Sequence, residues 1–348
     1  KAQAIGFRQT NGSQPFGMAQ PQARDGFAEC SPADQKRMSQ WAVHFEGAKQ
    51  ASEFLGRRPR RFVLLQEQRS GSERLERGSM SLSRHVKRIH FVRHGQGHHN
   101  AWREAEFAAG RTPHAKRDNM HEVPANLHDA ELTEAGRAEA EATSAAAGAC
   151  QPELLVTSPL RRAMQTGLKV FREAVSAGVP VLAHELCREQ FRSLDPSIYD
   201  SRKAREDLQK QFPQVSFDEY VLPSEFEIGD PIWWHSGSPF GSCEGGMHEA
   251  AMVEHAWQFL CWLMARPERE IAVATHSLFL LAMYHGALEL RDGGKHPGPQ
   301  VFHTGELRSL LIEERPPGPV AGAHLVRWGS TLAAGEDPVA ERKRARAA

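Results

Sequence analysis

Three short apolar segments along the chain each lead into an arginine or a histidine, and this repeated arrangement constrains the fold more than any other feature of the sequence. The segments cover residues 89–92, 153–157 and 271–275. Apolar runs of this length, bounded by Gly, Pro and Ser, are typical of buried β-strands. The cations and imidazoles that follow them are Arg93 and His94, then Arg162, then His276.

Arg93 and His94 come directly after the first predicted strand, and Gly95 and Gly97 mark a sharp turn beyond them. In an open α/β sheet, ligands bind at the carboxyl ends of the strands. A guanidinium at that edge suits the binding of a phosphate, and an imidazole suits nucleophilic attack on it. The alternative is a strand end with two solvated polar residues.

Helix signals follow the predicted strands. Thr133 is a credible N-cap for a helix to about residue 149, and Ser277 for a helix to about residue 290. Between them, Ser158 as N-cap and Pro159 at the first helical position predict a third helix.

That third helix carries Arg161 and Arg162 in its first turn. Arginine there opposes the helix dipole unless an anion is bound, which favours a phosphate site. Viewed alone, the position fits an ordinary surface pair of arginines equally well. A lone histidine such as His276 is more often structural than catalytic. Together, however, two cations and two imidazoles at one sheet edge are what phosphoryl transfer through a histidine nucleophile needs.

The composition argues against several other classes of protein. A formal net charge of zero disfavours binding of nucleic acid or of anionic membranes as the main function. The five cysteines are widely spaced without a C-x-x-C pair, which disfavours a disulfide framework or a structural zinc site and favours the cytoplasm. A membrane-spanning helix needs about 18 consecutive apolar residues, and no apolar run in the sequence is that long.

The chain is predicted to divide into three parts. Residues 1–85 form an extension that contains a helix over residues 31–55, with Ser31 as its N-cap. Within residues 57–88, ten Arg or Lys face three Glu, a surplus of seven positive charges; a solvated linker is preferred over a targeting or nucleic-acid segment. Residues 86–314 form the catalytic domain, and residues 315–348 a flexible tail. Residues 101–130 are predicted to be a loop, and residues 191–246 a lid-like insertion broken by Pro and Gly.

Several motifs together resemble the histidine phosphatase superfamily, also called the phosphoglycerate mutase-like proteins, over about residues 86–314. The matches are Arg-His-Gly at residues 93–95, a downstream Asn at Asn100, Leu-Thr-x-x-Gly at residues 132–136, Ser-Pro-Leu-x-Arg-Ala-x-x-Thr at residues 158–166, and the second histidine at His276. The segments 185–189, 233–234, 259–263 and 305–308 are most similar to a eukaryotic, plant- and alga-type branch. The resemblance implies an α/β three-layer sandwich with a mainly parallel central sheet and helices on both faces.

The resemblance also implies roles for individual residues. His94 is the nucleophile that forms a phosphohistidine, and it must be neutral, with its other nitrogen held by a backbone carbonyl or a similar partner. Arg93 and Arg162 clamp the phosphate oxygens, while His276 and Asn100 donate hydrogen bonds. Cationic side chains replace a metal in this scheme, so neither a metal nor another cofactor is expected. The further histidines do not match a metal-ligand spacing.

The general acid and the substrate contacts are less well defined by the resemblance. Glu189 matches the position of the family's acid, although Arg192 replaces the glycine that usually follows it, and Glu185 is the alternative. Asp200 and Arg202 are candidates for substrate binding. The tryptophans at residues 233–234 either line the pocket or pack in the core.

The predicted function is metal-independent hydrolysis of a small phosphomonoester through a phosphohistidine. The polar, Pro- and Gly-broken insertion suits a lid that admits water, which favours hydrolysis over a phosphoglycerate mutase-type transfer. The other alternative is a catalytically idle protein that uses its phosphate pocket for binding; the intact set of Arg93, His94, Arg162 and His276 argues against it.

Overall fold

The computed structural model describes residues 60–69, 85–111, 123–189, 198–217, 220–221, 247–291 and 300–315. The helix predicted over residues 31–55, most of the predicted lid and residues 316–348 lie outside these ranges. No helix in the described part of the chain is long and apolar enough to cross a lipid bilayer.

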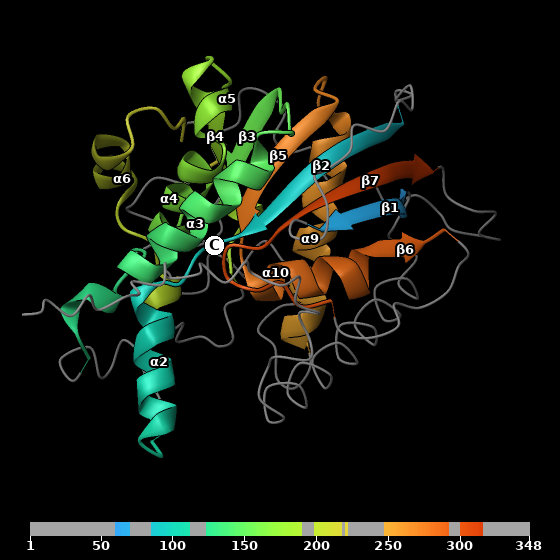
Figure 1. The fold of residues 1–348 in the computed structure, drawn as a ribbon. Coiled ribbons are helices and arrows are strands. Elements are labelled where there is room, and N and C mark those ends of the chain that lie inside the picture. The colour runs from blue at the N-terminus through green and yellow to red at the C-terminus, as the bar shows by residue number, and fades with distance from the viewer. Residues whose placement is uncertain are drawn as a thin grey trace, which may run out of the picture.

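The described residues form one seven-stranded sheet in the order β4-β3-β5-β2-β7-β1-β6 (Figure 1). Only β7 runs antiparallel to its neighbours, whereas the other pairs are parallel. The prediction of a mainly parallel sheet is therefore confirmed. The strands are β1 (Arg61–Arg69), β2 (Val86–Arg93), β3 (Leu154–Thr157), β4 (Val181–Ala183), β5 (Glu270–Thr275), β6 (Leu288–Leu290) and β7 (Leu307–Arg315).

Helices cover both faces of the sheet, as the three-layer prediction requires (Figure 1). The α-helices are α2 (His98–Ala108), α3 (Glu134–Ala147), α4 (Arg161–Val170), α5 (Arg172–Ser176), α6 (Arg205–Gln211), α9 (Met247–Ala265) and α10 (Ser277–Ala282). Short 3-10 turns occupy η2 (Ala125–Leu127), η3 (Glu185–Cys187) and η4 (Ile198–Asp200), and a π-helical turn, η5, occupies Met283–Ala287.

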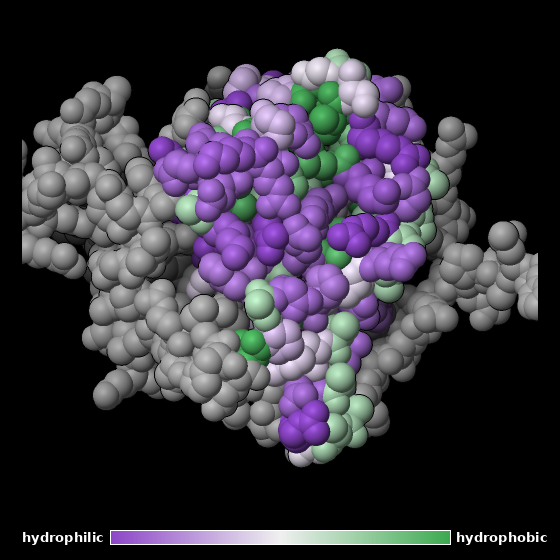
Figure 2. Space-filling model, turned by 90° about the vertical axis from the view of Figure 1, so that its left-hand side faces the viewer, coloured by the Kyte–Doolittle hydropathy of each residue, from purple (hydrophilic) through white to green (hydrophobic). Residues whose placement is uncertain are grey.

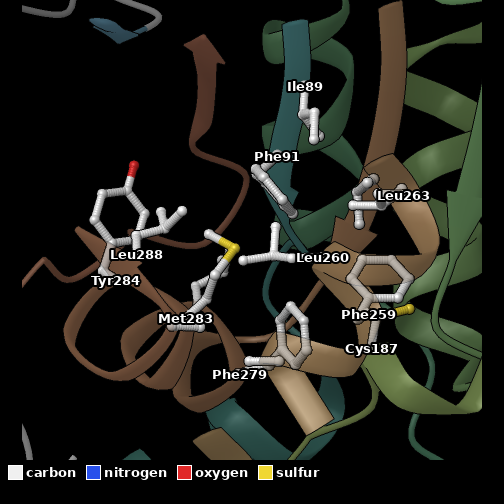
Figure 3. Packing of buried hydrophobic residues seen from close by; sticks show 14 of the residues in the cluster. Ile89, Phe91, Cys187, Phe259, Leu260, Leu263, Phe279, Met283, Tyr284 and Leu288 are labelled. Carbon is white, nitrogen blue, oxygen red and sulfur yellow. The ribbon is translucent and has the colours of Figure 1, made fainter. Parts of the chain in front are cut away.

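Two apolar cores result from the alternation of side chains along the central strands. Ile89 and Phe91 of β2 point toward α9 and α10, where Phe259, Leu260 and Phe279 pack against them (Figure 3). Val92, the next residue, belongs to the opposite core beneath α3 and α4. Because both faces are covered, all residues of the segments 89–92, 154–157 and 271–275 are buried, as is usual for parallel sheets. The two cores fix the carboxyl ends of β2, β3 and β5 side by side.

The segment predicted to be a solvated linker contains a strand of the sheet, so that prediction is wrong for β1. Phe62 and Val63 are almost completely buried. Two of the positive charges that suggested solvation are neutralised within the fold, since Arg61 pairs with Glu289 and Arg60 with Glu314. The sheet therefore begins before residue 85, where the extension was predicted to end.

Three predictions about helices are also wrong. Residues 101–130 are not all loop, because α2 occupies His98–Ala108. α4 begins at Arg161 with Leu160 as its N-cap, rather than at Pro159. The helix after β5 has His276 as its N-cap and ends at Ala282, and a π-helical turn and β6 follow where the helix was predicted to continue.

Candidate active site

His94 lies immediately beyond the end of β2, and its backbone N–H donates to the carbonyl of Thr275 in the neighbouring β5 (3.0 Å). Its imidazole is buried, and Nδ1 lies 2.7 Å from the carbonyl oxygen of Gly95. Because a carbonyl only accepts hydrogen bonds, Nδ1 carries the proton and Nε2 keeps its lone pair. Burial, followed by the charges of Arg162 and Arg93, holds the pKa of His94 well below its usual value. The ring is therefore neutral and nucleophilic at Nε2.

The turn after His94 is locked by direct backbone contact with the first turn of α3. A Cβ on Gly95 would lie 2.4 Å from the carbonyl oxygen of Gly136, and one on Gly136 would lie 2.1 Å from the carbonyl oxygen of Gln96. Thr133 caps α3, as predicted, by accepting a hydrogen bond from the Gly136 N–H (3.0 Å). This contact explains why glycine is needed at both positions.

We expect Gly136→Ala to lower the free energy of unfolding by about 2 kcal/mol or more, because the added methyl group meets backbone atoms that cannot move aside. The matched control is Gly148→Ala at the other end of α3, where φ is −59° and the nearest atom to a new Cβ is 3.5 Å away. Chemical denaturation of both variants measures the difference. Equal stability of the two variants would contradict the proposed backbone contact.

Arg162 is completely buried and directs its guanidinium at the nucleophile. Its Nε lies 3.4 Å from Nε2 of His94, Nη1 donates to the carbonyl of Tyr199 (2.6 Å), and Nη2 donates to Asp200 (2.8 Å). Its neighbour Arg161 instead binds the backbone carbonyl of Asp129 and the carboxylate of Glu131. Of the two arginines predicted in this turn, only Arg162 belongs to the site.

His276 approaches His94 from the end of β5, and the two ring centroids are 5.0 Å apart. Nε2 of His276 lies 2.8 Å from the hydroxyl of Ser158, whereas its buried Nδ1 has no hydrogen-bond partner in the described part of the chain. Burial, followed by the charges of Arg162 and the other groups around it, holds the pKa of His276 well below the usual value. The site thus contains a second neutral imidazole with an uncommitted nitrogen.

Arg93 and Asn100 lie on either side of the turn that follows β2. Nη1 of Arg93 donates to the carbonyl of Phe302 (2.7 Å), which anchors the side chain to the loop before β7. The side-chain oxygen of Asn100 accepts from the Gly97 N–H (2.9 Å) and closes the first turn of α2. The side-chain oxygen of Asn100 therefore faces the turn. Its NH2 group is the hydrogen-bond donor that this side chain can offer to a ligand.

The predicted acidic residues separate into two groups. Glu189 accepts from the backbone N–H of Leu278 (3.2 Å) at the start of α10, and Asp200 accepts from Arg162. Burial raises the pKa of Asp200 to about 6 against the opposing charge of Arg162, and the nearby charge of Glu189 adds to the increase. Both carboxyl groups therefore belong to the site.

Glu185 and Arg202, in contrast, pair with each other (2.9 Å), and Glu185 also binds Arg188 (3.0 Å). Arg188 in turn donates to the backbone carbonyl of Asp200 (2.8 Å). Arg202 is buried in this network, so the structure gives it a supporting contact and not the substrate contact predicted from sequence. Glu185 is committed to two arginines, which disfavours it as the acid.

Sequence reasoning missed His99 and Tyr199 as parts of the site. The buried ring of His99 lies 5.6 Å from that of His94 and stacks on Tyr199 at 5.1 Å. His99 was considered only as one of many possible metal ligands. The available signal was its place next to Asn100, in the first turn of a helix that the sequence pattern did not predict.

Comparisons with known proteins agree with this geometry. Residues 89–212 match the model of the histidine phosphatase superfamily (branch 1). Two Arabidopsis thaliana relatives, phosphoglycerate mutase-like protein 1 and a phosphoglycerate mutase-like protein, are each 28% identical over 66% of this chain and cover 82% and 85% of their own lengths.

Similar solved structures include a mycobacterial glucosyl-3-phosphoglycerate phosphatase (20% identity, 57% of this chain, 77% of that chain, TM-score 0.31). A putative alpha-ribazole-5'-P phosphatase from Escherichia coli matches at 21% identity over 57% of this chain and 77% of its own, with a TM-score of 0.33.

Over residues 89–212 the chain is similar to the histidine phosphatase superfamily. Members of this superfamily are phosphatases or mutases, which makes it a family of phosphoryl-transfer enzymes. Within it, the chain is similar to the plant-type phosphoglycerate mutase-like branch.

Proposed function

We propose that the protein is a metal-independent phosphomonoester hydrolase that acts through a phosphohistidine. The observation that carries this proposal is the state of His94. Its Nδ1–H donates to Gly95, and its Nε2 lone pair faces the guanidinium of Arg162. The nucleophile and the cation that would bind the phosphoryl group thus lie next to each other in a buried site.

In the first proposed step, Nε2 of His94 attacks phosphorus in line with the ester oxygen, forming the N–P bond as the P–O bond breaks. Arg162 and Arg93 bind the equatorial oxygens of the phosphoryl group. His276, in the tautomer with its proton on Nδ1, donates a hydrogen bond from Nδ1–H to these oxygens and stabilises the developing charge. A carboxyl group gives its proton to the leaving oxygen. In the second step the same carboxylate takes a proton from water, which attacks phosphorus and releases phosphate from His94.

Asp200 supports this proton transfer better than Glu189, the residue that the sequence favoured. Asp200 touches Arg162, which is itself in contact with the nucleophile, whereas Glu189 binds the turn that begins α10. A pKa of about 6 also keeps a substantial fraction of Asp200 protonated in mildly acidic solution. We therefore propose Asp200 as the acid and Glu189 as the residue that orients the His276 turn and raises the pKa of Asp200.

The pH dependence of kcat/KM tests this assignment. The acid must carry its proton, so we expect kcat/KM to be constant on the acid side and to decline about tenfold per pH unit above pH 6, in line with the pKa of Asp200. His94 stays neutral across this range because its pKa is lowered. Asp200→Asn should remove the decline and lower the maximum about 10² to 10⁴-fold. Asp207→Asn, an exposed control on α6, should change neither.

The alternative outcome is that kcat/KM still declines near pH 6 in Asp200→Asn but no longer declines in Glu189→Gln. This result would assign the acid role to Glu189.

Incubation with a panel of phosphomonoesters tests the proposed hydrolysis. In one arm, the protein receives 3-phosphoglycerate with a trace of 2,3-bisphosphoglycerate, and both free phosphate and 2-phosphoglycerate are followed. We expect phosphate release to dominate. Bisphosphate-dependent interconversion much faster than phosphate release would make the protein a mutase, and no turnover of any ester would favour the idle binding protein.

A further inference from the structure

Asp129 is a completely buried carboxylate that the proposed reaction does not use. The described surface on the side of the molecule that carries α2 and α6 is largely hydrophilic (Figure 2), whereas a carboxylate removed from water needs hydrogen bonds in exchange. Asp129 also has a φ of 48°, the only positive φ of a non-glycine residue in the described part of the chain. Asp tolerates this left-handed conformation, which strains most other residues. An unusual backbone conformation at a buried charge supports a hypothesis about function.

The two carboxylate oxygens of Asp129 join two separate segments of the chain. Oδ1 accepts the backbone N–H of Arg161 (2.9 Å), the first residue of α4, and Oδ2 accepts the backbone N–H of Lys203 (2.9 Å). Arg162 of the site follows directly on the first of these partners, and Asp200 of η4 lies three residues before the second. The carboxylate of Asp129 therefore spans, from outside the site, the two segments whose side chains form the ion pair of Arg162 and Asp200 (2.8 Å).

The two joined segments differ in how firmly the rest of the fold holds them. α4 is fixed by its own packing, since Met164 and Val170 lie in the core beneath the sheet. η4 is a single 3-10 turn, and Tyr199 within it is only partly buried. A segment with few buried apolar contacts is displaced more easily than a packed helix. Loss of a bond to Asp129 should therefore move η4 and leave α4 in place.

We propose that Asp129 is a positioning residue for Asp200, the acid of the proposed reaction. It takes no part in bond making or breaking. By fixing the chain beyond η4 to the start of α4, it holds the carboxyl group of Asp200 where the leaving oxygen can take its proton. The inference rests on the proposed function for this proton transfer, and it adds a residue on which the transfer depends.

Asp129→Asn removes one of the two bonds while it keeps the shape of the side chain. The amide has one carbonyl oxygen, so its NH2 group must face a backbone N–H, and two donors cannot form a hydrogen bond. Asn also tolerates a positive φ, so the substitution adds no backbone strain.

Two esters separate a positioning role from a general loss of structure. Glycerol 3-phosphate must release an alkoxide and needs the acid, whereas p-nitrophenyl phosphate releases a stabilised phenolate and does not. For both esters kcat/KM reports the first step, because release of the alcohol commits the substrate. We expect Asp129→Asn to lower kcat/KM about 10-fold or more for glycerol 3-phosphate, and less than about threefold for p-nitrophenyl phosphate.

A double-mutant cycle adds a readout that a merely structural role would not give. If Asp129 acts through Asp200, Asp129→Asn should lower kcat/KM for glycerol 3-phosphate no further in an Asp200→Asn protein, whereas independent damage would add its own loss. Glu153→Gln is the matched control. Its carboxylate also accepts two backbone N–H groups, from Arg269 (2.9 Å) and Glu270 (3.1 Å), but at the opposite edge of the sheet. It should change kcat/KM for neither ester.

Lys203→Pro tests the same bond from the other side, because proline has no N–H, and it should repeat the ester pattern where Asp129→Asn is too unstable to assay. Hydrogen exchange of the full-length protein, followed by mass spectrometry, reports on η4 without reference to activity. Exchange in residues 198–203 should accelerate in the variant, and exchange in residues 161–170 should not.

Equal loss of kcat/KM for both esters, additive loss in the double mutant, or unchanged exchange in residues 198–203 would overturn the inference. Faster exchange in residues 198–203 of Asp129→Asn, together with no hydrolysis of either ester by the wild-type protein, would sustain the positioning of η4 and reject the proposed hydrolase.

Discussion

Replacement of His94 by alanine is expected to abolish phosphate release. The imidazole supplies the only nucleophile in the proposed mechanism, and removal of such a group typically costs about 10⁴-fold or more in kcat. His276→Ala should lower kcat less, by about 10² to 10⁴-fold, because it removes a stabilising donor and leaves the covalent step intact. Single-turnover assays with acid quench measure both effects, and a phosphorylated protein should form only where His94 is present.

Two controls make the His94 result specific. His98→Ala removes a neighbouring imidazole from α2 that is only partly buried, and it should retain turnover near the wild-type rate. Far-ultraviolet circular dichroism and thermal melts show whether His94→Ala remains folded. Near-wild-type turnover by a folded His94→Ala protein would reject the phosphohistidine mechanism.

The residues at the ends of the central strands could be predicted because their signals are local. An apolar run followed by Gly, Pro or Ser identifies a buried strand and its turn without knowledge of the remaining chain. Parallel strands then bring their carboxyl ends to one edge, which is why His94 and His276, 182 residues apart in the numbering (276 − 94), lie in ring contact. The need for a neutral nucleophile likewise predicted the carbonyl at Nδ1, which Gly95 provides.

The outer strands and the second layer of the site could not be predicted, because distant partners create them. β1 contains several charged side chains, and only its pairing with β7 and β6 shows that it is a strand of the sheet. α2 lacks a continuous apolar stripe, so periodicity did not reveal it, and His99 was missed with it. The proposed acid role of Asp200 depends on its contact with Arg162, which lies 38 residues earlier. Contacts between residues that are far apart in the sequence cannot be recognised from local sequence patterns.

Replacement of Arg162 by lysine is the second substitution that we expect to lower kcat/KM strongly. The guanidinium donates to Tyr199 and Asp200 from two separate nitrogens while a third faces His94. A lysine ammonium is a single point charge and cannot keep these directions at once. The completely buried position also penalises an ammonium group that lacks enough partners. We expect kcat/KM to fall about 10² to 10³-fold, comparable to the loss of one preorganised donor in an active site.

Arg161→Lys provides the matched control, because the two arginines are adjacent on α4 and Arg161 binds Asp129 and Glu131 away from the nucleophile. It should lower kcat/KM by less than about threefold. The pH profile adds an independent readout. Arg162→Lys should raise the pKa of Asp200 further, because it removes the guanidinium hydrogen bond that lowers this pKa in the wild-type protein. Equal kcat/KM for Arg162→Lys and the wild-type protein would mean that position 162 contributes charge alone, and the bidentate clamp would have to be abandoned.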